Sequence, residues 1–194
     1  MRWSFPRLTT IMRTLVSCSP SVCLRPMRPL LLATLTALLL LGCRSEAQSP
    51  PSEDVQIAAA IKAAPAAMRS EATVRGYADD MTVTTLREGE GALVCLADDP
   101  RSDKFHVACY HKSLAPFMKR GRELRQQGRS GAAVDSIRRA EIESGALSYP
   151  DQPAALYNLS GPAGAYNAEA DTVQNGSRLR VLYVPYATAE STGL

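Results

Sequence analysis

The 194-residue chain has a formal net charge of +3, but five of its 22 basic residues and none of its 19 acidic residues precede Cys43. The part after Cys43 is therefore slightly acidic, and the charge balance gives no support to nucleic-acid binding. That part is long enough for one domain with a real hydrophobic core, and it shows no internal repeat of the solenoid type.

The chain begins with a segment typical of an export signal. Its apolar stretch, LLLATLTALLLL at 30–41, is twelve residues long. A membrane-spanning helix needs about 18 or more such residues, whereas the core of a signal peptide needs about 7 to 15 behind a positively charged region. Arg25 and Arg28 supply that charge. We therefore predict a signal peptide over 1–42, with Met27 as a natural start of a shorter leader.

The apolar stretch ends at Leu40-Leu41-Gly42-Cys43, which resembles the lipobox of bacterial lipoproteins. The resemblance implies that Cys43 carries a diacylglycerol thioether and becomes the acylated N-terminus after cleavage. Two or three acyl chains would anchor the protein stably in a lipid bilayer. In the sorting pattern of lipoproteins, Arg44 favours the outer membrane, facing the periplasm, if the organism is diderm. The alternatives are a secretory signal with a chance cysteine or an uncleaved short anchor.

The mature chain is expected to start with a lipidated N-terminus and a flexible polar tether over 43–53, rich in polar residues and proline. Asp54 then opens an alanine-rich helix, which Pro65 interrupts. Ile57 and Ile61 lie four residues apart on this helix. They mark the face that we expect to pack on the core.

Four short segments then have the composition of strands. They are rich in Val, Thr and aromatic residues and are bounded by turn residues, which predicts an antiparallel meander. The sequence EGEG at 88–91 is expected to form one of the turns. The segments are 72–77, 81–87, 92–97 and 105–110.

The rest of the chain predicts two helices and further strands. The helices cover 114–127 and 130–145, and the strands cover 154–159 and, after an Asn-Gly turn, 177–187. Together these elements predict a single α+β domain over 54–194, with a small antiparallel sheet (meander plus C-terminal strands) and about three helices. Because the chain stops soon after its last strand, we expect the domain to be truncated at its C-terminus.

The segment CLADDPRSDKFHVACYH contains both histidines of the chain and the two cysteines that follow Cys43. Cys95, His106, Cys109 and His111 are ligand types that zinc accepts. Their spacing, however, lacks the closely spaced pairs of a zinc knuckle and the C-x-x-C-H pattern of covalent haem attachment. If 105–110 is a strand, His106 points away from the face that holds Cys109 and His111.

A disulfide makes fewer demands on this segment. If the two strands pair about the centre of the loop between them, Cys95 and Cys109 lie opposite each other at a separation that a disulfide accepts. An exported protein meets an oxidising environment. We therefore predict a Cys95–Cys109 disulfide, with a zinc or haem site that uses Cys95, His106, Cys109 and His111, or a redox-active pair, as alternatives. His111 is also placed to hydrogen-bond at the start of the next helix.

The two predicted helices carry many basic residues. They could form a patch for lipid phosphates or cell-wall polymers, or they could form a solvated surface with ion pairs one helical turn apart. Acidic residues at 123, 135, 141 and 143 offset part of this charge. The basic residues are Lys119, Arg120, Arg122, Arg125, Arg129, Arg138 and Arg139.

The sequence contains none of the common nucleophile, metalloprotease or nucleotide-binding motifs, and it points to no catalytic residue. The segment from Cys95 to His111 and the ending YVPYATAESTGL are similar to uncharacterised exported bacterial proteins, and the resemblance implies an exported domain. We therefore expect a membrane-anchored, non-catalytic binding module of the cell envelope, without a cofactor and with an unidentified envelope partner. A metal- or haem-linked redox protein and a hydrolase are the alternatives.

Overall fold

The computed structural model describes residues 49–193. The predicted signal peptide, the acylation site Cys43 and most of the predicted tether lie outside the described residues. Among the residues from 49 to 193, no helix is long and apolar enough to cross a membrane.

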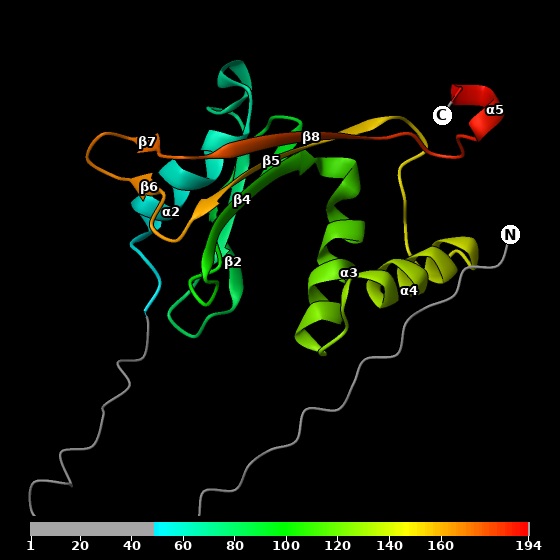
Figure 1. Ribbon diagram of the computed structural model, residues 1–194, viewed down its shortest axis with the longest axis horizontal. Coiled ribbons are helices and arrows are strands. Elements are labelled where there is room, and N and C mark those ends of the chain that lie inside the picture. Colours follow the sequence, from blue (N-terminus) through cyan, green and yellow to red (C-terminus); the bar gives the residue numbers. More distant parts are fainter. Residues whose placement is uncertain (1–48, 194) are drawn as a thin grey trace, which may run out of the picture. The chain divides into compact units, whose positions relative to one another are not determined.

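The fold is α+β, as the sequence predicts, with a six-stranded mixed sheet, helices on both of its faces and a small two-stranded hairpin (Figure 1). The helices are α2 (Glu53–Ala60), α3 (Ala115–Gln126), α4 (Gly131–Glu143) and α5 (Ala189–Thr192), with 3-10 turns η1 (Ile61–Ala63), η2 (Ala66–Met68) and η3 (Lys112–Leu114). The strands are β1 (Thr73–Tyr77), β2 (Val83–Arg87), β3 (Leu93–Leu96), β4 (Lys104–His111), β5 (Ala154–Pro162), β6 (Tyr166–Asn167), β7 (Thr172–Val173) and β8 (Ser177–Tyr183).

The strand order in the large sheet is β2-β1-β3-β4-β5-β8. Four of the neighbouring pairs are antiparallel, as predicted, but β1 and β3 run parallel. The predicted meander is wrong at this point because 88–91 is a crossing and not a turn. The Gly91 N–H donates to the Glu71 carbonyl oxygen at 2.8 Å, and a Cβ at Gly89 would collide with that same oxygen. The two glycines thus let the chain pass the start of β1 and reach its other side.

The predicted Asn-Gly turn lies within the connection from β5 to β8 and does not join two paired strands. Strands β5 and β8 pair with each other, whereas β6 and β7 form their own small hairpin within the connection. Asn175 has a φ of 51°, so the Asn-Gly pair makes a turn. This turn leads from β7 into β8, and these two strands do not pair with each other.

The sheet separates two hydrophobic cores. On one face, α2 and η1 pack with small residues such as Ala59, Ala60 and Ala63 against β1, β3, β4 and β5. On the other face, Leu114 and Phe117 of the η3–α3 segment pack against Tyr110 and Leu156. Ile57 and Ile61 pack against the first core, as expected, and are partly buried, whereas Ala59, Ala60 and Ala63 are buried within it.

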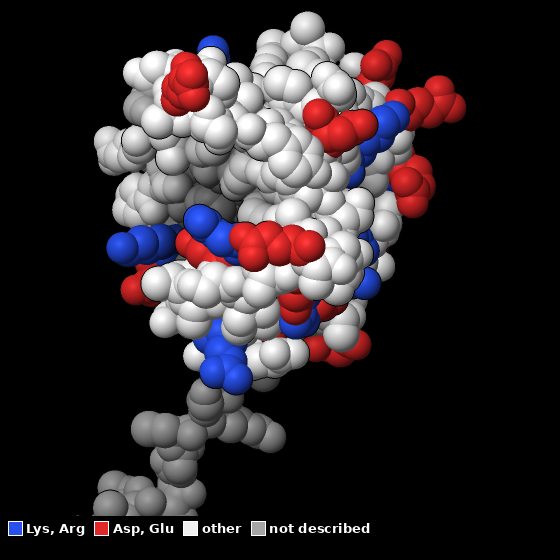
Figure 2. Space-filling view, turned by 90° about the vertical axis from the view of Figure 1, so that its right-hand side faces the viewer, with Lys and Arg blue, Asp and Glu red and all other residues white. Residues whose placement is uncertain are grey.

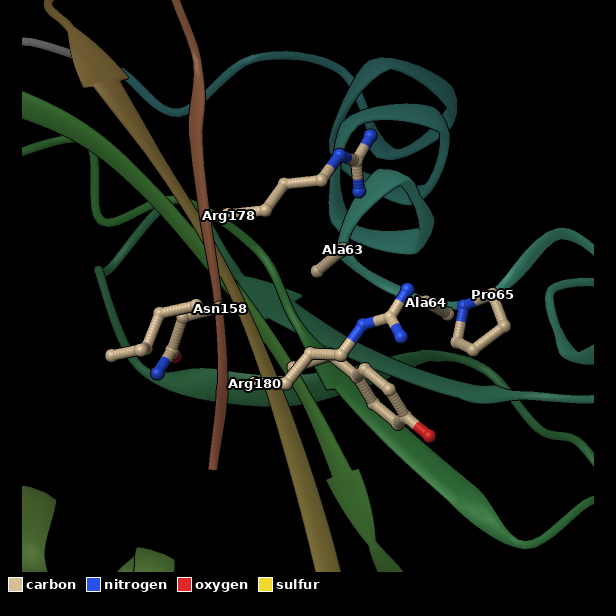
Figure 3. A pocket seen from close by; sticks show the side chains of 8 residues that line it. Ala63, Ala64, Pro65, Asn158, Arg178 and Arg180 are labelled. Carbon is tan, nitrogen blue, oxygen red and sulfur yellow. The ribbon is translucent and has the colours of Figure 1, made fainter. Parts of the chain in front are cut away.

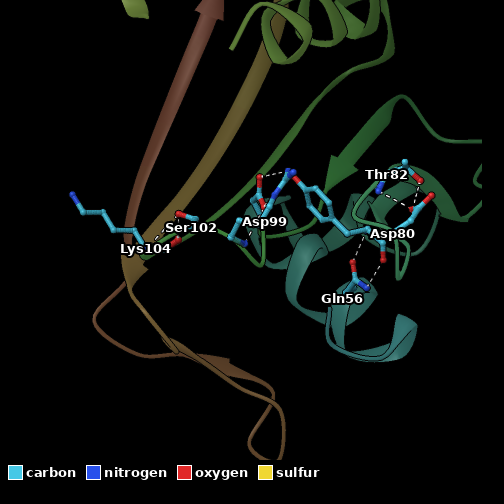
Figure 4. Close-up of polar contacts among 8 residues, drawn as sticks. Gln56, Asp80, Thr82, Asp99, Ser102 and Lys104 are labelled. Carbon is cyan, nitrogen blue, oxygen red and sulfur yellow. Dashed lines mark hydrogen bonds and ion pairs between the residues drawn. The ribbon is translucent and has the colours of Figure 1, made fainter. Parts of the chain in front are cut away.

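Gln56 fastens α2 to the sheet (Figure 4). Its side chain is 4% exposed, and its amide oxygen accepts the Tyr77 N–H at 2.8 Å. Its amide nitrogen donates to the carbonyl oxygens of Tyr77 at 3.0 Å and Pro51 at 2.8 Å. Because all of these groups are paired, the buried amide costs little and fixes the register of α2 on β1.

Candidate functional site

The two cysteines of the segment 95–111 form a disulfide. Cys95 and Cys109 are directly opposed in the β3–β4 register, and their Cα atoms are 4.0 Å apart. Both are 0% exposed, and the Cys109 sulfur lies 3.4 Å from the Ala60 carbonyl oxygen beneath η1. The predicted pairing is confirmed, and because no thiolate can reach this bond in the folded protein, its role is structural.

The structure does not bring the four candidate metal ligands together. The two cysteines are bonded to each other, and His106 faces the opposite side of the sheet, where its Nε2 lies 3.2 Å from Asn158 Oδ1. His111 Nδ1 lies 2.7 Å from Ser113 Oγ and accepts the Ser113 N–H, so it caps the start of η3 as the sequence suggests. Within the described part of the chain, no group of three or more His, Cys, Asp or Glu residues could hold a metal ion.

A basic groove lies between the β1–β2 hairpin and α3. It consists of two adjoining hollows of about 280 and 310 Å³, which share Val83, Arg122 and Gln126 as lining residues. We call this continuous depression the groove. Five basic and two acidic side chains line it: Arg75, Arg101, Lys119, Arg122, Arg125, Asp99 and Glu123.

Two of the five cations in the groove are neutralised by acids. Arg101 binds the Asp99 carboxylate through two nitrogens at 2.8 Å, and Asp99 is labelled in Figure 4. Lys119 lies 3.9 Å from Glu123, one helical turn away. The side chains of Arg75, Arg122 and Arg125 make no ion pair or hydrogen bond with any residue from 49 to 193. The groove therefore keeps an excess of positive charge at its centre.

Arg75 is the most constrained of these three arginines. It projects from β1, is partly buried, and its Nε is shielded from solvent without a hydrogen-bond partner among the described residues. An unpaired buried N–H costs about 1 to 3 kcal/mol. Arg75 also lines the groove, so a turn of its guanidinium group toward an anionic ligand there would give this N–H the acceptor that it lacks.

Tyr77 lies at one end of the groove. Burial raises its pKa to about 12, with the Asp99 carboxylate adding to the effect. The Arg101 guanidinium lies 5.6 Å from the centre of its ring and holds the pKa of Asp99 below its usual range. Tyr77 therefore stays neutral at physiological pH and offers a flat, partly apolar wall beside the arginines.

Most other basic residues of the two helices serve the structure. Arg120 binds Glu141 of α4 at 2.6 Å, and Arg138 lies 3.8 Å above the Phe117 ring while it binds Asp135. On the face shown in Figure 2, basic and acidic side chains likewise lie side by side. The predicted ion-paired surface and the predicted basic patch are thus both present, but on different parts of the helices.

Sequence patterns identify Lys119, Arg122 and Arg125 but not the two arginines that face them. Arg75 is an ordinary outward position of a predicted strand, and Arg101 belongs to a loop. Their role depends on which face of the sheet α3 covers, which no local pattern specifies.

A smaller hollow of about 50 Å³ lies at the other side of the sheet. Arg178 and Arg180 extend from β8 toward Ala63, Ala64 and Pro65 (Figure 3). Arg178 already donates to the Lys62 carbonyl oxygen at 2.8 Å. Since this hollow has room for little more than one water molecule, we do not assign a ligand to it.

Comparisons with protein-family models, curated proteins and solved structures find no match for this chain. Its activity must therefore be inferred from the geometry of its own residues.

Proposed function

We propose that the chain is a lipid-anchored, non-catalytic binding module of a bacterial cell envelope, and that the groove holds an anionic ligand. The lipobox-like Leu40-Leu41-Gly42-Cys43 and the apolar stretch before it support export and acylation of Cys43. The disulfide is consistent with an oxidising compartment outside the cytoplasm. Arg44 supports an outer-membrane location facing the periplasm in a diderm organism.

One observation carries the ligand assignment: the arginines at the centre of the groove form no ion pair with an acidic residue of the described part, 49–193. Arg75 and Arg122 are both partly buried and come from facing elements, β1 and α3. A guanidinium group binds phosphate or carboxylate through two parallel hydrogen bonds, and these are stronger where water is partly excluded. The groove is therefore suited to a ligand that carries phosphate or carboxylate groups.

The binding experiment uses the full-length chain in detergent and inorganic polyphosphate as the probe. We expect saturable binding that weakens as salt is added, because exposed charges are screened. Arg122→Gln keeps much of the side-chain length but removes the charge. Since a hydrogen bond to a charged group contributes about 1.5 to 3 kcal/mol, this variant should bind about tenfold or more weakly.

Arg129→Gln is the matched control, because Arg129 is exposed just beyond the same helix and does not line the groove. It removes the same charge from the same protein. Equal losses of affinity in the two variants would show that polyphosphate responds only to net charge, and the groove would not be the binding site.

Anchoring is tested separately. Cys43→Ser should abolish acylation, detected as loss of the lipid mass, and should release the protein from the membrane fraction of the expressing bacterium. A Cys43→Ser protein that still carries acyl chains would contradict the lipobox interpretation, whatever the groove binds.

A further inference from the structure

A second hollow, of about 180 Å³, lies on the α2 face of the sheet. Its walls are mainly apolar and come from three separate segments: α2 and the residues just before it, the β3–β4 connection with the start of β4, and the β5–β6 connection with the start of β6. Three lining residues have polar side-chain groups: the amide of Gln56, the carboxylate of Asp98 and the hydroxyl of Tyr166. The lining residues are Pro51, Val55, Gln56, Ala59, Asp98, Pro100, Phe105, Gly164 and Tyr166.

Most polar groups around this hollow are already used. The Gln56 amide is fully paired with backbone groups of Tyr77 and Pro51. The Tyr166 hydroxyl donates to Asp171 Oδ1 at 2.8 Å, and Lys62 binds the other oxygen of that carboxylate. Neither side chain is free to bind a ligand without giving up a contact.

Asp98 differs from these groups. Its Oδ1 accepts the His106 N–H at 2.7 Å, but no residue of the described chain donates to its Oδ2 or forms an ion pair with it. The nearest arginine in sequence, Arg101, is held by Asp99. Asp98 therefore lines a mainly apolar hollow, and one of its carboxylate oxygens accepts no hydrogen bond from residues 49–193.

The cost of this arrangement is visible in the acidity of the group. Burial raises the pKa of Asp98 above its usual value, although the hydrogen bond from His106 acts in the opposite direction. A partly buried carboxylate beside apolar walls is stabilised when a cation with matching hydrogen-bond donors lies next to it. Among residues 49–193, no lysine or arginine forms an ion pair with Asp98.

We infer that this hollow binds a small alkylammonium compound, with the ammonium group on Asp98 Oδ2 and the alkyl chain against Pro51, Val55 and Phe105. An engineered protein cavity of about 150 Å³ holds benzene, so 180 Å³ suits a ligand of about six to eight non-hydrogen atoms. Carboxylates and phosphates of similar size are excluded by repulsion from Asp98. The site is independent of the groove, and its ligand has the opposite charge.

The test measures binding of three probes of equal chain length, namely pentylammonium, 1-pentanol and pentanoate, to the full-length chain in detergent. We expect pentylammonium to bind saturably, with amide chemical-shift changes confined to residues that line the hollow, such as Ala59, Phe105 and Gly164. The two other probes should bind at least about tenfold more weakly, because one hydrogen-bonded ion pair contributes about 1.4 kcal/mol or more.

Asp98→Asn keeps the acceptor for the His106 N–H but removes the charge, and it should reduce pentylammonium binding about tenfold or more. Asp103→Asn, on the same exposed connection but outside the hollow, should leave binding unchanged. Val55→Phe places a larger side chain in the hollow and should block binding of all three probes. A denaturation curve with an unchanged midpoint would show that this variant is still folded. The inference is overturned if pentanol binds as well as pentylammonium, if Asp98→Asn and Asp103→Asn behave alike, or if no probe perturbs the lining residues.

Discussion

The two faces of the sheet are built on different principles. On the α2 face, alanines bring the helix backbone close to the sheet, and a buried disulfide joins β3 to β4. On the α3 face, the rings of Phe117, Tyr149 and Tyr183 meet edge to face, and Arg138 covers Phe117. The first face is held by a covalent bond and small side chains, whereas the second is held by large side chains that also position the arginines of the groove.

We therefore expect stability and polyphosphate binding to be coupled on the α3 face and separable on the α2 face. The groove needs α3 at its observed place beside β1 and β2, and Phe117 is one of the residues that pack α3 against the sheet. The disulfide lies on the far side of the sheet from the groove. Weakening the two faces should therefore have different consequences for polyphosphate binding.

Phe117→Ala should have the largest effect. The side chain is 9% exposed and contacts two tyrosine rings and a guanidinium group, so its removal should lower the free energy of unfolding by about 3 to 5 kcal/mol. Polyphosphate binding should weaken as well, because α3 loses its anchor. Chemical denaturation and a binding titration on the same sample measure both quantities. Phe117→Leu, which keeps most of the volume, should retain most of each, and an unchanged affinity in Phe117→Ala would contradict the coupling.

Replacing both Cys95 and Cys109 by Ala should have a somewhat smaller effect, and on stability alone. The bond closes a loop with a sequence separation of 14, for which loop closure contributes about 3 kcal/mol in the chain-entropy model. The variant should unfold at lower denaturant concentration yet bind polyphosphate with unchanged affinity. Loss of binding in a variant that is still folded would show that the two faces are not separable.

Tyr77→Phe should have the smallest effect, which appears only at alkaline pH. The folded-state pKa of Tyr77 is raised from 10.0 to about 12, so the folded protein holds this proton more tightly than the unfolded chain does. The stability linked to it is complete below pH 10 and is lost as the pH rises toward 12. In Tyr77→Phe, unfolding measured over this range should depend less on pH. An identical decline in both proteins would show that Tyr77 titrates normally.

Local patterns in the sequence predict most of the elements because each pattern depends on neighbouring residues. In the segment from Cys95 to Cys109, the two cysteines lie at equal distances in sequence from the centre of the loop. Antiparallel pairing about that centre is therefore enough to place them opposite each other. Local reasoning fails at Gly89 and Gly91, because glycines are typical both of a tight turn and of a segment that passes close to another part of the backbone. Here they let the chain pass the start of β1. Only part of the groove can be predicted from the sequence. Arg122 lies on a helix that the sequence predicts, whereas Arg75 lines the groove only because α3 packs beside β1 in the folded protein.

The most direct test of the groove is an NMR titration that follows the side-chain Nε–H resonance of Arg75. In isotope-labelled full-length protein, the Nε–H resonance of Arg75 should shift saturably as inorganic polyphosphate is added, with the same affinity as the overall binding curve and with the shift lost in Arg122→Gln. That result would show that the ligand supplies the acceptor that this buried N–H lacks. A resonance that stays in place while polyphosphate binds would contradict our account, because the anion would then lie elsewhere on the molecule.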